Sequence, residues 1–132
     1  MSVQTFTDML GATILVVEGA KRGSDVMRLC ADDGRAFVFE HDQDCCEQVA
    51  IEDVVGDVAD LLGSPLVLAE EISSEGEPPP DCADSFTWTF YRFATAKGTV
   101  TVRWLGESSG YYSEDVDMRV ERPVAQSGGV KP

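Results

Sequence analysis

The stretch FTWTFYRFATAKGTVTVRW, residues 86–104, decides the fold class that the sequence predicts. Apolar side chains alternate with polar ones on both sides of Lys97-Gly98, which is a turn signal. The alternation places Phe86, Trp88 and Phe90 together on one face of a strand. One apolar and one wet face is typical of an antiparallel sheet. The stretch therefore predicts a β-hairpin whose apolar face carries these three aromatic residues.

Further strands flank this hairpin. Residues 12–18, 25–31 and 35–40 are rich in β-forming residues and are separated by turns, so they predict a three-stranded meander. Residues 66–72 predict one more strand. Alternation in residues 112–121 predicts that the second meander continues beyond the hairpin.

Two segments favour short helices. Residues 5–10 predict one helical turn with Thr5 as its cap. Residues 48–62 show alternation at their start and helical spacing of apolar residues further on. We favour a strand over residues 48–53 followed by a short helix over residues 57–62.

Together these elements predict an α+β fold, which is mainly an antiparallel β-sheet of about seven or eight short strands with one or two short helices. We expect a single domain over residues 1–124, since 132 residues is an ordinary size for one domain. Residues 73–84 are predicted to form an acidic, proline-rich surface loop. Residues 125–132 are small and polar and are predicted to form a disordered tail.

The negative charge of the chain is concentrated in one segment. The net charge is −14, and the residues between Arg35 and Arg92 include 14 carboxylates and no lysine or arginine. Such a field repels nucleic acid and acidic membranes and attracts basic protein surfaces. The sequence also has no signal-peptide pattern and no apolar run long enough to cross a bilayer. We therefore expect no direct nucleic acid partner and no membrane partner.

The densest polar cluster is EHDQDCCE, residues 40–47, directly after a predicted strand. Loops at the edge of a sheet often carry binding residues. A Gly/Ser-rich loop with two tyrosines, near residue 111, is a second candidate interaction surface. The candidate ligand or partner contacts are Glu40, His41, Asp42, Gln43, Asp44, Cys45, Cys46, Glu47, Tyr111 and Tyr112.

This cluster leaves several chemistries open. His41 and the carboxylates are a candidate cation site, and His41 with Cys45, Cys46 and either Cys30 or Cys82 could supply four zinc ligands. The spacing matches no common zinc motif, so the metal assignment stays open. Buried, reduced thiols and a solvated connecting loop are the simplest interpretation.

Catalysis has little support in the sequence. Surrounding carboxylates raise the pKa of a thiol, which opposes a cysteine nucleophile with His41 as its base. The chain has no Gly-rich phosphate loop and no Ser/His/Asp set. We therefore predict a non-enzymatic protein with no catalytic residues and no cofactor.

Glu70 and Glu71 form an acidic pair at the end of a predicted strand. Neighbouring strand residues face opposite sides of a sheet, so one of these side chains points inward. A buried carboxylate needs a partner. We expect an arginine to supply it.

Several motifs together carry a resemblance. The runs FEHDQDCCE (residues 39–47), AEE (69–71), FYRFAT (90–95) and GESSGYYS (106–113) resemble an uncharacterised family found widely in bacteriophages and prophages. The resemblance extends over roughly residues 9 to 121 and transfers no catalytic residues. It implies a small phage-encoded accessory protein that works in the cytoplasm of a bacterial host.

Two function hypotheses follow. The first is a non-enzymatic accessory protein that binds a host protein with a basic surface, for example by blocking a nucleic-acid-handling or defence enzyme. The alternative is a small-ligand or metal-binding module that sequesters a host metabolite through the His41–Glu47 loop. An exposed sheet edge leaves a homo-oligomer open.

Overall fold

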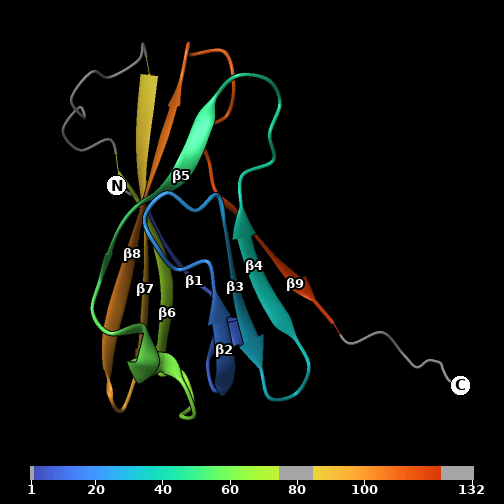
Figure 1. Ribbon diagram of the computed structural model, residues 1–132, viewed down its shortest axis with the longest axis vertical. Coiled ribbons are helices and arrows are strands. Elements are labelled where there is room, and N and C mark those ends of the chain that lie inside the picture. The colour runs from blue at the N-terminus through green and yellow to red at the C-terminus, as the bar shows by residue number, and fades with distance from the viewer. Residues whose placement is uncertain (1, 75–84, 123–132) are drawn as a thin grey trace, which may run out of the picture.

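The computed structural model describes residues 2–74 and 85–122, which form two antiparallel β-sheets packed face to face (Figure 1). The five-stranded sheet has the order β1-β6-β7-β8-β5, and the four-stranded sheet has the order β2-β3-β4-β9. The strands are β1 (Ser2–Thr5), β2 (Ile14–Glu18), β3 (Val26–Ala31), β4 (Ala36–Glu40), β5 (Gln48–Val55), β6 (Leu68–Ser74), β7 (Ser85–Thr95), β8 (Gly98–Ser108) and β9 (Asp117–Glu121).

The predicted α+β fold class is wrong. In the described residues the only helical segments are two 3-10 turns, η1 (Thr7–Met9) and η2 (Val58–Leu61). So short a segment cannot repay the cost of nucleating an α-helix. The strand predicted over residues 48–53 is confirmed as part of β5, but the helix predicted over residues 57–62 is only the 3-10 turn η2. Gly56, at a φ of 107°, then ends the strand where a Cβ would collide with the carbonyl oxygen of Thr99.

The predicted strands are largely confirmed, but the position of the last strand is not. The first meander is the β2-β3-β4 part of the smaller sheet, and residues 86–104 form the hairpin of β7 and β8. The second meander does not continue into β9. Both neighbours of β8 are already taken, by β7 and β5, so β9 crosses to the other sheet and pairs with β4. The first strand, β1, carries too few alternating residues to be predicted.

The β7 arm of the hairpin buries the opposite face from the one predicted, whereas Val100, Val102 and Trp104 of the β8 arm are buried as their alternation predicts. Thr89, Tyr91 and Phe93 point into the interior, whereas Phe86, Trp88 and Phe90 are only half-buried. On the outer face the guanidinium of Arg103 lies 4.8 Å from the ring centroid of Trp88. A cation over an indole ring is a favourable contact at a partly exposed site. The outer aromatic residues therefore have a stable place without entering the core.

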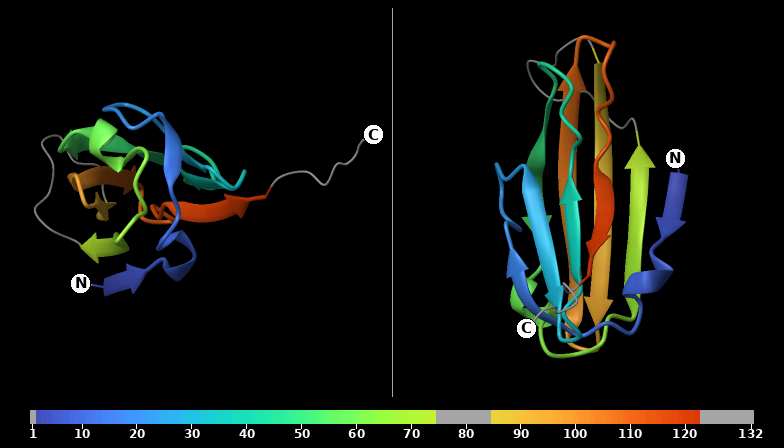
Figure 2. Two further views of the ribbon diagram at one scale, coloured as in Figure 1. Left: turned by 90° about the horizontal axis from the view of Figure 1, so that it is seen from below. Right: turned by 90° about the vertical axis from the view of Figure 1, so that its right-hand side faces the viewer.

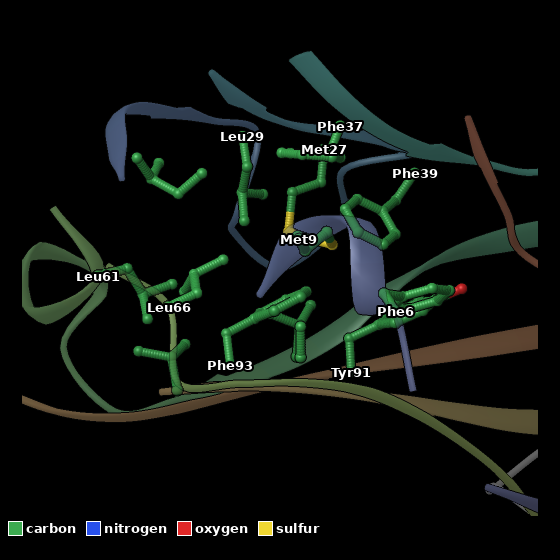
Figure 3. Close-up of a cluster of buried hydrophobic side chains, with 14 of the residues drawn as sticks. Phe6, Met9, Met27, Leu29, Phe37, Phe39, Leu61, Leu66, Tyr91 and Phe93 are labelled. Atoms are coloured by element: carbon green, nitrogen blue, oxygen red, sulfur yellow. The ribbon is translucent and has the colours of Figure 1, made fainter. Parts of the chain in front are cut away.

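An aromatic cluster joins the two sheets. Phe39 of β4 has its ring centroid 4.8 Å from that of Tyr91 and 5.7 Å from that of Phe93, both on β7 (Figure 3). Phe6, just after β1, lies 6.0 Å from both Phe39 and Tyr91. Edge-to-face and offset-stacked pairs at these distances add to the energy of apolar burial. Phe39 is therefore the main contact between the layers.

The smaller sheet does not cover the larger one completely. Figure 2 (right) shows β1 and β6 extending past β9, on the side where the four-stranded sheet ends. The margin of the larger sheet that carries β1 and β6 thus extends beyond β9, the edge strand of the smaller sheet.

Some predicted features lie outside the described residues. Of the predicted acidic loop, Ser73 and Ser74 belong to β6, and residues 75–84 are not described. Cys82 and the predicted tail over residues 125–132 also lie outside the described part. Among the described residues, no helix is long and apolar enough to cross a membrane.

Replacing Phe39 with alanine should strongly destabilise the protein. Phe39 is fully buried, and truncating a buried phenylalanine costs about 3–5 kcal/mol in the free energy of unfolding. Tyr111→Ala is the matched control, because Tyr111 is 89% exposed and a surface substitution changes stability by about 0.5 kcal/mol or less. Urea unfolding followed by circular dichroism would measure both. Equal losses for the two variants would contradict the role of Phe39.

Candidate functional site

Two loops meet at one end of the sandwich. Residues 41–47 join β4 to β5, and residues 109–116 join β8 to β9, so each loop crosses from one sheet to the other (Figure 1). Their strands are neighbours, since β4 pairs with β9 and β5 pairs with β8. The structure thus brings the predicted cluster of residues 40–47 close to Tyr111 and Tyr112.

The carboxylate of Glu47 organises the first loop. Its side chain is fully buried, and its Oε2 accepts hydrogen bonds from His41 Nε2 at 2.7 Å and from the Asp44 amide at 2.9 Å. Its Oε1 accepts hydrogen bonds from the Cys45 amide at 2.8 Å and from Gln43 Nε2 at 3.3 Å. Burial alone would raise the pKa of Glu47, but the hydrogen bonds from His41 and the two amides lower that pKa to about 2.

His41 ties the two loops together. Its Nδ1 lies 2.7 Å from the carbonyl oxygen of Asp115, which only accepts hydrogen bonds, and its Nε2 faces the ionised Glu47. With Glu47 ionised, both contacts favour the protonated imidazole, in which each ring nitrogen donates. Burial opposes that charge, but the hydrogen bonds to Glu47 and to the Asp115 carbonyl raise the pKa of His41 above its ordinary value.

This geometry decides what the cluster can do chemically. A histidine with both ring nitrogens donating has no lone pair for a metal ion or for a proton. Both oxygens of Glu47 are occupied by four hydrogen bonds, which come from His41, Gln43 and the amides of Asp44 and Cys45. Among the described residues, no group of three or more His, Cys, Asp or Glu side chains is arranged to hold a metal ion. His41 and Glu47 therefore act as structural residues that position the rest of the loop.

A second buried carboxylate organises the other loop. Glu114 is 8% exposed and accepts hydrogen bonds from the hydroxyls of Thr87 and Ser108. Gly106 makes this close approach feasible, since a Cβ there would collide with the backbone of Glu114. We did not predict a role for Glu114, because a single acidic residue in a polar loop carries no sign of burial.

The remaining predicted contacts form the outer surface of this end. The side chains of Asp42, Asp44, Cys45, Cys46 and Tyr111 are exposed. The expectation of buried thiols is therefore wrong for the two cysteines, because both side chains point away from the interior that Glu47 occupies.

Other predicted contacts are held by partners. The neighbouring Cys45 raises the pKa of Tyr112, and the backbone oxygen of Tyr112 accepts a hydrogen bond from Ser108 Oγ. Gln43 donates to the backbone oxygen of Glu47 at 2.6 Å. Glu40 pairs with Arg119 of β9. These contacts fix the outer surface on the buried framework.

An acidic cleft lies beside this end, along the margin of the larger sheet that extends beyond β9. It has a volume of about 370 Å³ and runs between β9 and the β1, β6 and β7 strands of the larger sheet. Three carboxylates line it, from Glu71, Asp115 and Asp117, and none of the described lining residues is a lysine or arginine. The other polar groups are Gln4, Ser73 and Thr89. The cleft could not be predicted from the sequence, because Asp115 and Asp117 lie outside the acidic segment between Arg35 and Arg92.

Glu71 is the inward-facing member of the acidic pair. We expected an arginine partner, but the Tyr91 hydroxyl donates to Glu71 Oε1 at 2.7 Å. The arginine pairs instead with the outward-facing residue, since Arg92 Nη1 lies 3.4 Å from Glu70 Oε2. Burial raises the pKa of Glu71, the hydrogen bond from Tyr91 lowers it, and the charges of Asp115 and Asp117 raise it. Repulsion from Asp115 and Asp117 thus disfavours the ionised form of Glu71 in the cleft.

A smaller hollow continues this acidic surface. It has a volume of about 270 Å³ and shares Asp117 with the cleft. Its other lining residues are Glu40, His41, Asp42 and Arg119. Arg119 pairs with Glu40 of the hollow and also with Glu121, so one of the three carboxylates that line the hollow is already paired. The cleft and the hollow thus connect the loop cluster with the margin between the sheets.

Replacing Glu47 with glutamine should lower the pKa of His41. His41 is the only histidine in the chain, so its titration can be followed directly by NMR. We expect an imidazole pKa above 6.5 in the wild type and a clear fall in Glu47→Gln, because a neutral amide replaces the carboxylate. Asp42→Asn, an exposed neighbour, is the control and should keep most of the shift. An unchanged pKa in Glu47→Gln would contradict the pairing.

The same pair predicts a pH window of stability. The pKa of Glu47 falls from 4.5 to about 2 on folding, so its contribution is complete above pH 4.5 and is lost as the pH falls towards 2. The pKa of His41 rises on folding, so its contribution is complete below pH 6.5 and is lost as the pH rises through the folded pKa. Urea unfolding of the wild type and Glu47→Gln should differ most between these limits. A pH-independent difference would refute this.

Comparisons with known proteins identify a family whose function is unknown. A family model described as "Domain of unknown function (DUF7448)" matches residues 7–118. No curated protein and no solved structure matches the chain. The match spans both loops and most of the residues that line the cleft.

Proposed function

Because the chain belongs to the DUF7448 family, which supplies no activity, we propose from its geometry that it is a non-enzymatic binding protein. Its acidic cleft takes a basic segment of a host protein, with a lysine or arginine side chain entering between β9 and the larger sheet. The observation that carries the proposal is the cleft itself, which places the carboxylates of Glu71, Asp115 and Asp117 around one opening with no lysine or arginine among its described lining residues.

The electrostatics favour a cationic occupant. Glu71 is half-buried, and Asp115 and Asp117 disfavour its ionised form. An entering cation relieves that repulsion and interacts with all three carboxylates. Gln4 and Ser73 add neutral hydrogen-bonding groups at the same opening. A partly enclosed site of this kind gives a basic side chain more than an isolated surface ion pair, which contributes about 0.2–1 kcal/mol.

The framework around the cleft supports binding rather than catalysis. His41 and Glu47 bind each other and the backbone, so they hold the adjacent loop without offering a free base or nucleophile. The exposed Tyr111 and Tyr112 extend the surface beyond the acidic margin, and tyrosine is common in protein interfaces. The proposed contact therefore combines an acidic cleft with a nearby aromatic rim.

The biological setting of the proposal is a phage-encoded accessory protein in the cytoplasm of a bacterial host. In that setting the partner is a host protein with a basic surface, and a nucleic-acid-handling or defence enzyme is the class that fits best. Basic grooves in such enzymes bind the regularly spaced charges of nucleic acid. An acidic margin that occupies such a groove would compete with the nucleic acid.

Neutralising the cleft should weaken binding of a basic probe. We expect Asp115→Asn/Asp117→Asn to bind a short oligolysine peptide about tenfold more weakly, since losing two ion pairs removes about 1.4 kcal/mol. The control Asp8→Asn/Asp32→Asn removes the same charge at the other end of the smaller sheet, where both side chains are exposed. Isothermal titration calorimetry would measure all three proteins. Equal weakening in both variants would show that total charge, not the cleft, binds the peptide.

The interaction should also depend steeply on salt. A host protein captured from bacterial lysate at low salt should be released by a salt step, because screened ion pairs lose most of their attraction. The captured protein should then compete with oligolysine for the wild type and bind Asp115→Asn/Asp117→Asn more weakly. Binding that does not change between low and high salt would overturn the electrostatic basis of the proposal.

A further inference from the structure

Cys45 and Cys46 present two thiols side by side at the exposed end of the sandwich. Their Sγ atoms lie 2.8 Å apart, and both residues are exposed. A disulfide bond has a length of about 2.05 Å, so the two sulfurs are within about 0.8 Å of bonding distance. Closing a ring between adjacent residues also requires the backbone to adapt, because consecutive Cα atoms lie about 3.8 Å apart and disulfides normally span about 4.4–6.8 Å. Access for a small reagent and proximity of the two sulfurs are therefore both present.

The backbone under this pair is held in place. The amide of Cys45 donates to the buried Glu47 carboxylate at 2.8 Å, and Gln43 Nε2 donates to the carbonyl oxygen of Cys45 at 3.1 Å. The next residue towards the N-terminus is held as well, since the Asp44 amide donates to Glu47 at 2.9 Å. Groups that are fixed close together react with each other far faster than free groups in solution. The loop therefore preorganises the two thiols for reaction with each other.

We infer that Cys45 and Cys46 are a thiol modification site that closes to a vicinal disulfide by exchange with a low-molecular-weight disulfide such as glutathione disulfide. The inference is independent of the proposed partner.

In the first step the sulfur of one cysteine, after losing its proton, attacks glutathione disulfide, and one glutathione thiol leaves with that proton. In the second step the neighbouring sulfur attacks the protein-side sulfur of the mixed disulfide. The second glutathione leaves and takes the second proton. Two cysteine thiols are oxidised, and one glutathione disulfide is reduced to two thiols.

The surroundings suit a modification target rather than a catalytic thiol. The hydrogen bond with Cys45, burial and the charge of Glu47 raise the pKa of Cys46, so its thiol stays protonated at neutral pH. A protonated thiol is a poor first nucleophile. Once a mixed disulfide has formed, however, the fixed neighbour is in place to displace the glutathione. Exchange therefore starts slowly and ends in the intramolecular bond.

Mass spectrometry of the full chain tests the inference. The protein is incubated with glutathione disulfide, alkylated with iodoacetamide and digested. We expect the peptide with Cys45 and Cys46 to lose the mass of two hydrogen atoms and to resist alkylation. Cys30→Ser and Cys82→Ser should behave like the wild type. Cys46→Ser should instead accumulate a stable glutathione adduct on Cys45, because no neighbour displaces it.

Three results would overturn the inference. One is alkylation of both cysteines after the incubation, and another is a stable glutathione adduct on the wild type. The third is a loss of the mass of two hydrogen atoms that occurs in the wild type and is absent in Cys82→Ser. That result would assign the disulfide to Cys82. Circular dichroism spectra that match the wild type would confirm that each variant is folded, and reduction by dithiothreitol should restore alkylation.

Discussion

The buried ion pair of His41 and Glu47 is the constraint on which this end of the protein depends. Both crossings between the sheets at that end, from β4 to β5 and from β8 to β9, are tied to it. Glu47 gathers the amides of its own loop, and His41 reaches the carbonyl of Asp115 in the other. A buried charge pair is stable only when hydrogen bonds satisfy its remaining groups. Here the backbone supplies them, so the pair defines the shape of both loops.

The position of Asp115 links this framework to the acidic cleft. Its carbonyl oxygen accepts the hydrogen bond from His41, while the residue also lines the cleft with Asp117 and Glu71. The same contact thus sets where β9 starts and where its first carboxylate lies. His41 and Glu47 form their hydrogen bonds within the two loops. The pair thereby determines the geometry of the surface that is proposed to bind a partner. The vicinal cysteines depend on the same carboxylate, through the Cys45 amide.

The fold redistributes the charge of the acidic segment. Several of its carboxylates meet bases from outside the segment, since Glu52 pairs with Arg22, Glu70 with Arg92 and Glu40 with Arg119. Conversely, Asp115 and Asp117 come from the part of the chain that is neutral overall, and they join Glu71 in the cleft. A run of charge along the chain is therefore a poor guide to a charged surface, because strand pairing brings distant residues together.

The sequence by itself determined the strands, the two candidate loops and the overall acidity. Period-two alternation and turn residues are local properties, so the β2-β3-β4 meander and the β7-β8 hairpin could be predicted from them. Only the tertiary structure decided that β9 leaves the second meander, that Thr89, Tyr91 and Phe93 face inward, and that residues 57–62 form no α-helix. Each of these depends on which edge or face is free after the other strands have paired, and that is a non-local property. The roles of His41, Glu47 and Asp115 were hidden for the same reason, since the contact between His41 and Asp115 joins residues that are 74 positions apart in the chain.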